Sequence, residues 1–220
     1  MQTHAVIFDA YGTLFDVTSV QQQTEETFPG HGDAITELWR RKQLEYTWLR
    51  ALMNRYKPFS QVTRDALVYA AKSRGLTPEA QQIQTLMAAY LTLHTFPEVT
   101  SVLAQLSNKR RAILTNGDLP LIEPAVRAAG LENALDAVLS VDSIQLYKPS
   151  PQAYALVTSQ LKVRAEHVLF VSSNPFDVVG ATNFGFRVAW VKRAGGQMDE
   201  LDTAPAHTVE TLTELLPLVA

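Results

Sequence analysis

The sequence contains no cysteine among its 220 residues. This absence excludes disulfide bonds, catalysis by a thiolate, and zinc or iron–sulfur centres held by cysteine. No apolar run approaches the roughly 18 residues of a membrane-spanning helix. The N-terminus has no basic segment followed by an apolar stretch, so no signal peptide is expected either. We therefore expect a cytoplasmic protein that does not enter a membrane.

Positive charge is also scarce. The chain has 19 lysines and arginines against 22 aspartates and glutamates, a net charge of −3, and residues 109–111 form a short basic cluster. A nucleic-acid partner is therefore not expected. The five histidines do not gather near the predicted strand ends, so no metal site is predicted from them. They are His4, His31, His94, His167 and His207.

Short apolar runs, which are typical of buried parallel strands, recur along the chain. They cover residues 5–8, 111–114, 137–140, 168–171 and 187–191. Three helices are predicted between the later runs, over residues 120–129, 151–161 and 176–184, with Asp118 as the N-cap of the first. This alternation predicts an α/β fold with a Rossmann-like, doubly wound parallel sheet and helices on both of its faces.

Residues 16–96 break this rhythm, because they contain no convincing strand. Apolar side chains recur there at helical spacing instead. Three helices are predicted, over residues 35–56, 62–74 and 77–93, the last opening at Thr77 and Pro78. The sequence therefore predicts a helical cap domain, residues 16–96, inserted directly after the first strand. Residues 1–15 and 97–220 are expected to form the α/β core.

Polar side chains lie where four of the predicted strands end. They are Asp9 and Thr13 after the first, Thr115 and Asn116 after the second, Lys148 after the third, and Ser172, Asn174 and Asp177 after the fourth. The carboxyl ends of parallel strands meet at one edge of the sheet, which is where open α/β sheets bind their ligands. These groups are therefore expected to share one cleft.

The four segments, in this order and at this spacing, resemble those of the haloacid dehalogenase superfamily, and specifically of its L-2-haloacid dehalogenases. Residues 38–50 also resemble the cap helix of that family, so the resemblance covers essentially the whole chain. It implies an α/β core with a helical cap, an enzyme that uses no metal or organic cofactor, and a homodimer that assembles through the cap. The expected partners are a 2-haloacid substrate, water and the halide product.

The resemblance implies that Asp9 attacks Cα of a short (S)-2-haloacid in line, expels halide and forms an aspartyl ester. An aspartate side chain has an unperturbed pKa of ~3.9, so it can attack carbon without a general base. Water then hydrolyses the ester to the (R)-2-hydroxy acid, and this step needs a base, for which we expect Asp177. Lys148 is expected to balance the two carboxylates, and Thr13 to orient Asp9.

The substrate carboxylate needs hydrogen-bond donors, and the family-like candidates lie in the turns after two strands. They are the hydroxyl of Thr115 and the backbone N–H groups of Ala10, Tyr11 and Asn116. A turn that leads into a helix is well suited to bind an anion. Ser172 and Asn174 are expected to support the lysine, the second aspartate and the attacking water.

The leaving halide also needs stabilisation. Arg40 matches the halide-abstracting arginine of the family, and helical spacing places it with Leu44 on one face of its helix. The expected pocket walls are Tyr11, Leu44, Phe59 and Phe176. Two positions depart from the family pattern, since Arg41 and Phe176 stand where relatives carry glutamine and tryptophan. The preferred halogen, the chain length and the turnover of fluoroacetate are therefore left open.

Other functions and roles compete with these. A phosphatase of the same superfamily needs an acid/base carboxylate two residues after Asp9 and further carboxylates for magnesium, but Tyr11 and Ser173 occupy those positions. A non-enzymatic, receiver-like signalling domain also pairs aspartates with threonine and lysine at strand ends, but it is smaller and has no helical cap. Two of the candidate residues also have an alternative without a catalytic role: Lys148 could be an ordinary surface lysine, and Arg40 an ordinary solvated arginine on its helix.

Overall fold

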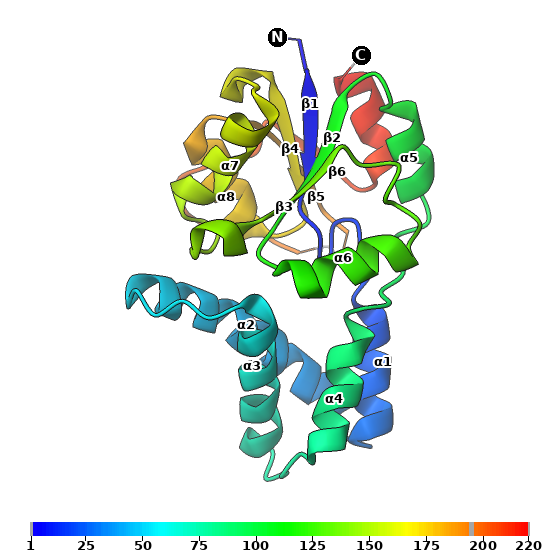
Figure 1. Cartoon of the computed structure of the whole chain (residues 1–220), viewed down its shortest axis with the longest axis vertical. Helices are drawn as coiled ribbons and strands as arrows, with labels where there is room; N and C mark the ends of the chain where they lie inside the picture. The colour runs from blue at the N-terminus through cyan, green and yellow to red at the C-terminus, as the bar shows by residue number, and fades with distance from the viewer. Residues whose placement is uncertain (1, 194–195, 220) are drawn as a thin grey trace.

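A parallel six-stranded sheet forms the centre of the computed structural model, which describes residues 2–193 and 196–219 (Figure 1). The strands are β1 Ala5–Phe8, β2 Arg110–Thr115, β3 Ala137–Ser140, β4 Val168–Ser172, β5 Arg187–Val191 and β6 His207–Val209. Their order is β3-β2-β1-β4-β5-β6, and each neighbouring pair is parallel. The predicted doubly wound α/β fold is confirmed. The outer limits of the expected core, residues 1 and 220, lie outside the described residues.

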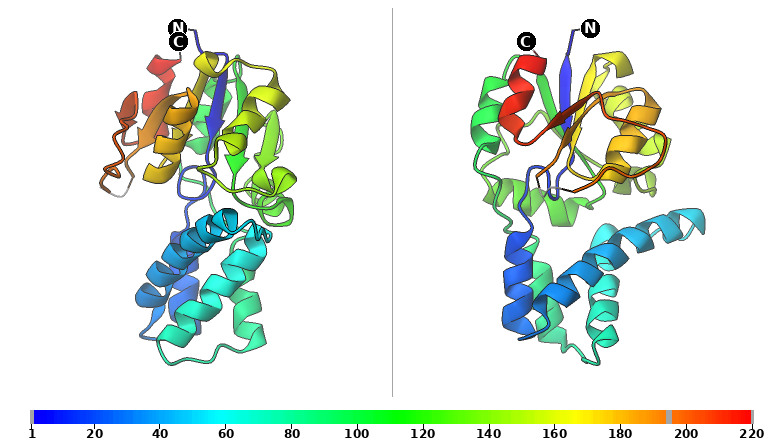
Figure 2. Two further views of the ribbon diagram at one scale, coloured as in Figure 1. Left: turned by 90° about the vertical axis from the view of Figure 1, so that its left-hand side faces the viewer. Right: turned by 180° about the vertical axis from the view of Figure 1, so that it is seen from behind.

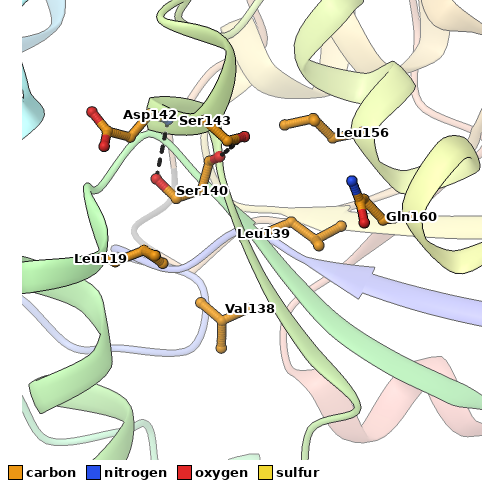
Figure 3. A pocket seen from close by; sticks show the side chains of 8 residues that line it. All are labelled: Leu119, Val138, Leu139, Ser140, Asp142, Ser143, Leu156 and Gln160. Atoms are coloured by element: carbon orange, nitrogen blue, oxygen red, sulfur yellow. Dashed lines mark hydrogen bonds between the residues drawn. The ribbon is translucent and has the colours of Figure 1, made fainter.

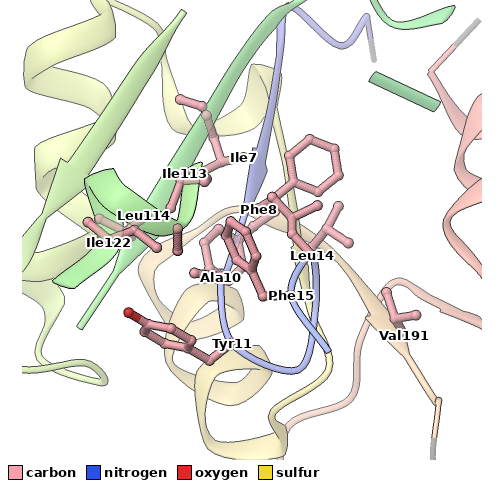
Figure 4. Close-up of a cluster of buried hydrophobic side chains, with 14 of the residues drawn as sticks. Ile7, Phe8, Ala10, Tyr11, Leu14, Phe15, Ile113, Leu114, Ile122 and Val191 are labelled. Atoms are coloured by element: carbon pink, nitrogen blue, oxygen red, sulfur yellow. The ribbon is translucent and has the colours of Figure 1, made fainter. Parts of the chain in front are cut away.

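The central strand β1 is enclosed on both faces. All four of its side chains are buried, which is why its sequence is a continuous apolar run rather than an alternating one. Figure 4 shows Ile7 and Phe8 of β1 near Ile113 of β2 in the hydrophobic core. Strands β2 and β4 extend one residue beyond the predicted runs, to Thr115 and Ser172. Two of the polar candidates are therefore the last residues of buried strands.

Helices cover both faces of the sheet. They are α5 Val99–Gln105, α6 Leu119–Ala128, α7 Pro151–Leu161 and α8 Pro175–Phe184, with short 3-10 helices η1 Val141–Ile144, η2 Ala165–His167 and η3 Leu212–Leu218. Helices α7 and α8 lie on one face, and α5 with η3 lies on the other (Figures 1 and 2). The three helices predicted for this part of the chain are α6, α7 and α8. Helix α8 ends at Gly185, whose φ of 104° suits a glycine at the end of a helix.

Five helices lie between β1 and β2 in the chain, and the first four of them form a separate layer beyond the carboxyl ends of the strands (Figures 1 and 2). They are α1 Thr18–Thr27, α2 Gly32–Leu52, α3 Phe59–Ser73 and α4 Ala80–Ala89. We call this layer of four helices the cap. Helix α4 begins later than the predicted start at Thr77, because Glu79 and Gln82 form a capping box that fixes its first turn.

Helix α2 ends earlier than predicted. It stops at Leu52 rather than at Tyr56, and Asn54 then adopts a left-handed conformation with a φ of 53°, which is incompatible with a continued helix. The apolar stripe of α2 also divides between two environments, since Trp39 is buried in the cap while Leu52 and Met53 are exposed. Within the described part of the chain, neither α2 nor any other helix has the length and apolar character needed to cross a membrane.

Besides the short helix α5 and the 3-10 helices, which were not predicted, two further elements had no clear signal in the sequence. Helix α1 was not predicted, because its residues are largely polar and only Val20 and Thr24 are buried. Strand β6 was not predicted either, because it has three residues and only Val209 among them is buried. In both cases the apolar face is too small to produce a recognisable period.

The two segments that connect the cap to the core run side by side. A bridge pairs Phe15 with Thr95, the N–H of Phe96 donates to the carbonyl of Leu14 at 3.0 Å, and the N–H of Asp16 donates to that of His94 at 2.8 Å. A pair of adjacent connections lets a domain rotate about a single short region, as a hinge requires.

Candidate active site

The turn after β1 fixes the first candidate, Asp9. The N–H of Asp9 donates to the carbonyl of Val171 in β4 at 2.9 Å, and the residue is 5% exposed. Gly12 has a φ of 82°, and a Cβ atom there would lie 3.1 Å from the hydroxyl oxygen of Ser173. Glycine therefore permits both the left-handed turn and the close approach of the segment that follows β4.

Four side chains donate hydrogen bonds to the carboxylate of Asp9. Lys148 Nζ donates to Oδ1 at 2.9 Å, and Asn174 Nδ2 donates to Oδ2 at 2.7 Å. The hydroxyls of Thr13 and Ser172 donate to Oδ2 at 3.3 and 3.4 Å. The carboxylate is thus held in one orientation by groups from three strand ends, as the sequence predicted for a shared cleft.

Lys148 lies at the centre of the cluster and is 1% exposed. Its Nζ also donates to Asp177 Oδ2 at 2.7 Å and to the carbonyl of Leu114 at 3.0 Å, so all three ammonium protons are used. Burial alone would lower the pKa of Lys148, but the carboxylates of Asp177 and Asp9 outweigh this effect and raise it. Lys148 is therefore not the surface lysine of the structural alternative.

Asp177 is fully buried in the first turn of α8. Burial raises the pKa of Asp177 to about 6; the charge of Lys148 works against this rise, and the charge of Asp9 adds to it. Its second oxygen, Oδ1, accepts a hydrogen bond from the hydroxyl of Tyr154 at 2.8 Å. A carboxyl group whose pKa lies near neutrality is suited to accept a proton from water.

Tyr154 is a polar partner that sequence reasoning missed. It lies on α7, where a buried tyrosine cannot be distinguished from an ordinary core aromatic without knowing that α7 packs against α8. A Cβ atom at Gly180 of α8 would collide with the Tyr154 hydroxyl. The glycine at position 180 is thus the one feature of the sequence that is consistent with a close contact between α7 and α8 near Tyr154.

The second strand end supplies further donors. Thr115 is fully buried, and its Oγ1 accepts a hydrogen bond from the N–H of Gly117 at 3.0 Å, which leaves its own proton for a ligand. Asn116 uses its side chain internally, since Oδ1 accepts from the N–H of Lys148 at 2.9 Å. In the part of the chain that the structure describes, no hydrogen bond uses the backbone N–H of Ala10, Tyr11 or Asn116.

The cap contributes a guanidinium to the same cleft. Arg40 of α2 donates from Nη2 to Asn174 Oδ1 at 3.2 Å and from Nη1 to Gln43 Oε1 at 2.7 Å. The side chain therefore reaches the core rather than solvent. Tyr11 lies with its ring nearly parallel to that of Phe59 on α3, the two centroids being 6.1 Å apart.

A small cavity lies between the core and the cap. Its lining consists of ten residues, all of them candidates from the sequence: Asp9, Tyr11, Arg40, Leu44, Phe59, Thr115, Asn116, Lys148, Asn174 and Phe176. The cavity has a volume of about 10 Å³, which is roughly the space that one water molecule needs. Thr13, Ser172 and Asp177 lie behind this lining. Because the cavity is so small, a substrate can enter only if the cap or the lining side chains move.

A larger cavity of about 260 Å³ lies at the outer side of β3 (Figure 3). Its one carboxylate, Asp142, accepts a hydrogen bond from the hydroxyl of Tyr56 in the cap. In its lining, the hydroxyl of Ser140 donates to the carbonyl of Gly117 and that of Ser143 to the carbonyl of Ser140. No charged pair comparable to Lys148 with its carboxylates lines this cavity, so the candidate site remains the smaller one.

One sequence prediction about Asp118 is corrected. Asp118 occupies the N-cap position of α6, as predicted, but its side chain makes no bond to that helix. Its carboxylate accepts hydrogen bonds from the N–H and hydroxyl of Ser60, at 2.9 and 2.7 Å, in the first turn of α3. Asp118 therefore caps helix α3 of the cap domain, and not helix α6 of the core as the sequence predicted.

A cation beside Asp9 would bind at Asp9 Oδ2 and at the carbonyl oxygen of Tyr11. In this structure both oxygens accept hydrogen bonds from one side chain, Asn174. Asn174 Nδ2 donates both to Asp9 Oδ2 at 2.7 Å and to the carbonyl of Tyr11 at 3.3 Å. Ser173, where the phosphatase alternative needs a carboxylate, donates from its N–H to the hydroxyl oxygen of Thr13 at 2.9 Å. Among residues 2–193 and 196–219, no group of three histidine, cysteine, aspartate or glutamate side chains is positioned to hold a metal ion.

Comparison with known proteins places this site in a family. The model of the haloacid dehalogenase-like hydrolases matches residues 3–185. An (S)-2-haloacid dehalogenase of Xanthobacter autotrophicus is 52% identical over 86% of this chain and 75% of its own length, and haloacetate dehalogenase H-2 of a Moraxella species is 43% identical over 98% and 97%. A solved L-2-haloacid dehalogenase of Xanthobacter autotrophicus with covalently bound chloropropionic acid superimposes with a TM-score of 0.94 and 44% identity, covering 99% of this chain and 98% of that one. The chain therefore belongs to the haloacid dehalogenase-like hydrolases, and within them to the family of the (S)-2-haloacid dehalogenases.

Proposed function

We propose that this enzyme hydrolyses short (S)-2-haloacids and haloacetates to (R)-2-hydroxy acids and glycolate, with release of halide. The observation that carries the proposal is the buried Asp9–Lys148–Asp177 cluster, in which one ammonium lies 2.9 Å from one carboxylate and 2.7 Å from the other. No metal or organic cofactor takes part, since a carboxylate can attack carbon unaided.

In the first step, an oxygen of Asp9 forms a bond to Cα of the substrate while the carbon–halogen bond breaks on the opposite side. The electron pair of that bond leaves with the halide. Lys148 and Asn174 hold Asp9 in place through Oδ1 and Oδ2 respectively. This fixed orientation supports attack along one line, which inverts the configuration at Cα.

In the second step, water attacks the carbonyl carbon of the Asp9 ester and gives a proton to Asp177. Esterification removes the negative charge of Asp9, which is one of the causes that raise the pKa of Asp177. Asp177 is thereby left as the ionised partner of Lys148 when a base is needed. Ser172, Asn174 and Thr13 keep the ester carbonyl oriented. The bond from the carbonyl carbon to the substrate oxygen then breaks, the proton held by Asp177 returns to that oxygen, and the hydroxy acid leaves; Asp9 is left as a carboxyl group that ionises again.

The substrate carboxylate binds in the turns after β1 and β2. The free N–H groups of Ala10, Tyr11 and Asn116 and the available proton of Thr115 are its donors. Backbone N–H groups at turns that lead into helices are favourable for anions. These contacts hold the halogen-bearing carbon next to Asp9.

The leaving halide binds against Arg40, with Leu44, Phe59 and Phe176 as apolar walls. The guanidinium stabilises the negative charge that appears on the halogen during attack. Phe176 also packs edge-on against Trp48 of the cap, with centroids 5.4 Å apart. The wall at position 176 is therefore shared between the core and the cap.

The cap, residues 16–96 in this proposal, opens and closes over a core formed by the rest of the chain. Its paired connections near Phe15 and Thr95 supply the hinge. Two copies of the chain associate through the outer end of the cap. Leu49, Leu52, Met53 and Tyr69 give that region an exposed apolar surface.

Halide release from chloroacetate, L-2-chloropropionate and D-2-chloropropionate, with and without EDTA, tests this function. We expect turnover of the first two substrates, no turnover of the D isomer, and no effect of EDTA. Magnesium-dependent hydrolysis of p-nitrophenyl phosphate in place of halide release would favour the phosphatase alternative. Fluoroacetate, run in parallel, reports how far the halide pocket can stabilise the poorest leaving group.

A further inference from the structure

Gln43 is a fully buried polar side chain in the cap. It lies on α2, one helical turn after Arg40 and facing α3. Neither its burial nor its amide is needed to build the helix, and a leucine or methionine would fill the same space. A buried amide lowers the stability of the folded protein unless its hydrogen bonds are made.

The amide of Gln43 joins Arg40 to the framework of the cap. Oε1 accepts a hydrogen bond from Arg40 Nη1 at 2.7 Å, and Nε2 donates to Thr63 Oγ1 at 2.7 Å. Thr63 is itself fully buried on α3, and its Oγ1 donates to the carbonyl of Phe59 at 2.7 Å. The indole of Trp39 donates to the carbonyl of Thr63, also at 2.7 Å. Two helices therefore hold this amide.

The direction of these bonds fixes which atom Gln43 presents to Arg40. Thr63 commits its one proton to the carbonyl of Phe59, so its oxygen can only accept from Gln43. The NH₂ end of the amide must therefore face Thr63, and the carbonyl end must face the guanidinium. With the reverse orientation, the amide NH₂ would point at a cationic donor. A hydroxyl at position 63 thus sets the orientation of a group that contacts the cleft.

We propose that Gln43 is a positioning residue that aims the Arg40 guanidinium at the leaving halide. This rests on the proposed function. One arm of Arg40 is fixed by Gln43 in the cap, and the other meets Asn174 Oδ1, whose amide nitrogen holds Asp9. The guanidinium is thereby held between the two layers at the point where halide leaves. Gln43 does not touch the substrate and acts only through Arg40.

Loss of the Gln43 contact should affect different leaving groups unequally. Stabilisation by Arg40 matters most for the poorest leaving group, so a misaligned guanidinium slows cleavage of carbon–chlorine bonds more than that of carbon–iodine bonds. It does not slow hydrolysis of the ester, since the halide has then departed. A residue that only filled space in the cap would show neither pattern.

Two matched pairs of variants test it. Gln43→Met keeps the volume and removes both hydrogen bonds. Gln43→Glu keeps the acceptor but adds a carboxylate that forms an ion pair with the Arg40 guanidinium and offsets the charge offered to the halide. Thr63→Val removes the acceptor that orients the amide, while Thr63→Ser retains it. Rapid-quench single turnovers with chloroacetate, bromoacetate and iodoacetate give the rate of ester formation and of ester hydrolysis separately. Iodoacetate is usable because the chain contains no cysteine.

We expect Gln43→Met and Gln43→Glu to slow ester formation from chloroacetate by roughly 10- to 100-fold, the effect of losing a hydrogen bond to a charged group. The loss with iodoacetate is smaller by at least about 5-fold, and ester hydrolysis is unchanged. Thr63→Val follows Gln43→Met in direction, and Thr63→Ser behaves like the natural enzyme. The inhibition constant of chloride, an equilibrium measure of the same site, rises by about 10-fold in the first three variants.

An equal slowing with all three haloacetates, or unchanged chloride inhibition, would overturn the proposal. So would a Thr63→Ser variant as impaired as Thr63→Val. If the natural enzyme releases no halide from haloacetates, the proposed function itself fails, and that outcome is distinct from the previous ones. Thermal unfolding of each variant shows whether the cap is intact, and the mild Thr63 pair keeps the test available if Gln43→Met does not fold.

Discussion

The carboxylate of Asp118 in the core accepts two hydrogen bonds from Ser60 in the cap, at 2.9 and 2.7 Å. Asp118 is 3% exposed, so this contact is shielded from water. It caps the first turn of α3 from outside the cap, and α3 carries Phe59 of the candidate pocket. In the proposed closing motion, the contact that holds the cap against the core is therefore also the contact that caps α3.

Asp118→Ala removes this contact and should favour the open arrangement. We expect a loss of about 1 kcal/mol in the free energy of unfolding, typical of a lost N-cap, and a rise in KM that exceeds the fall in kcat. Thermal unfolding and steady-state halide release measure the two effects. Glu132→Ala, which removes an exposed ion pair of Arg127, is the control. Unchanged KM and Tm in Asp118→Ala would show that the contact does not hold the cap closed.

Lys148→Met should abolish halide release. It leaves Asp9 and Asp177 buried together without their shared cation, which costs about 3–5 kcal/mol for a broken buried pair. Urea unfolding measures the loss of stability, and halide release from chloroacetate measures activity. Lys72→Met, at an exposed position of α3, serves as the control. A Lys148→Met enzyme with natural activity would rule out the role assigned to the cluster.

The pH dependence of ester hydrolysis should follow Asp177. Burial raises the pKa of Asp177 to about 6 while Asp9 is ionised. In the ester the charge of Asp9 is gone, which lowers this pKa, so ester hydrolysis should slow in acid at a pH below 6. The raised pKa of Asp177 has the opposite effect on the free energy of unfolding, because protonation removes the base but favours the folded state. Because the folded-state pKa is raised, Asp177 favours folding when protonated, and its contribution declines as pH rises from about 4 to about 6.

Single-turnover rates of ester hydrolysis between pH 5 and pH 8 (about the range over which the protein is expected to stay folded) measure this dependence. In Asp177→Asn the ester should accumulate and the acid limb should disappear. An acid limb that persists unchanged in this variant would assign the titration to another group.

The outer end of α2 should be a subunit contact. Leu52 is 80% exposed and Met53 is 59% exposed, close to the exposed Leu49 and Tyr69. Leu52→Lys should reduce the mass in solution from two chains to one, as measured by analytical ultracentrifugation. Leu201, which is 55% exposed on the core, provides the matched control Leu201→Lys. If both variants keep the mass of the natural protein, the contact lies elsewhere.

The strand ends were predictable from sequence because local rules determine them. A continuous apolar run followed by Asp9 and a glycine turn has few other structural meanings, and the segment Ser150–Pro151 opens α7 where predicted. Arg40 was placed by helical periodicity together with the family resemblance. Each of these depends on neighbours within a few positions of the chain.

The unpredicted contacts join residues far apart in sequence. Tyr154 reaches Asp177 only because α7 packs on α8, and Asp118 meets Ser60 only because the cap rests on the core. Gln43 looks like any polar helix residue until α3 buries it. Intrinsic propensities carry no information about such pairings, which arise from tertiary packing.

Formation of an ester on Asp9 is the step on which the whole mechanism depends. A single turnover of chloroacetate, with enzyme in excess, in water labelled with heavy oxygen tests it directly. Water attacks the ester carbonyl, so the label should appear in the carboxylate of Asp9, as found by mass spectrometry of the peptide that contains it, and the glycolate should be unlabelled. Label in the glycolate, with Asp9 unlabelled, would mean that water attacks the substrate itself and that Asp9 is not the nucleophile.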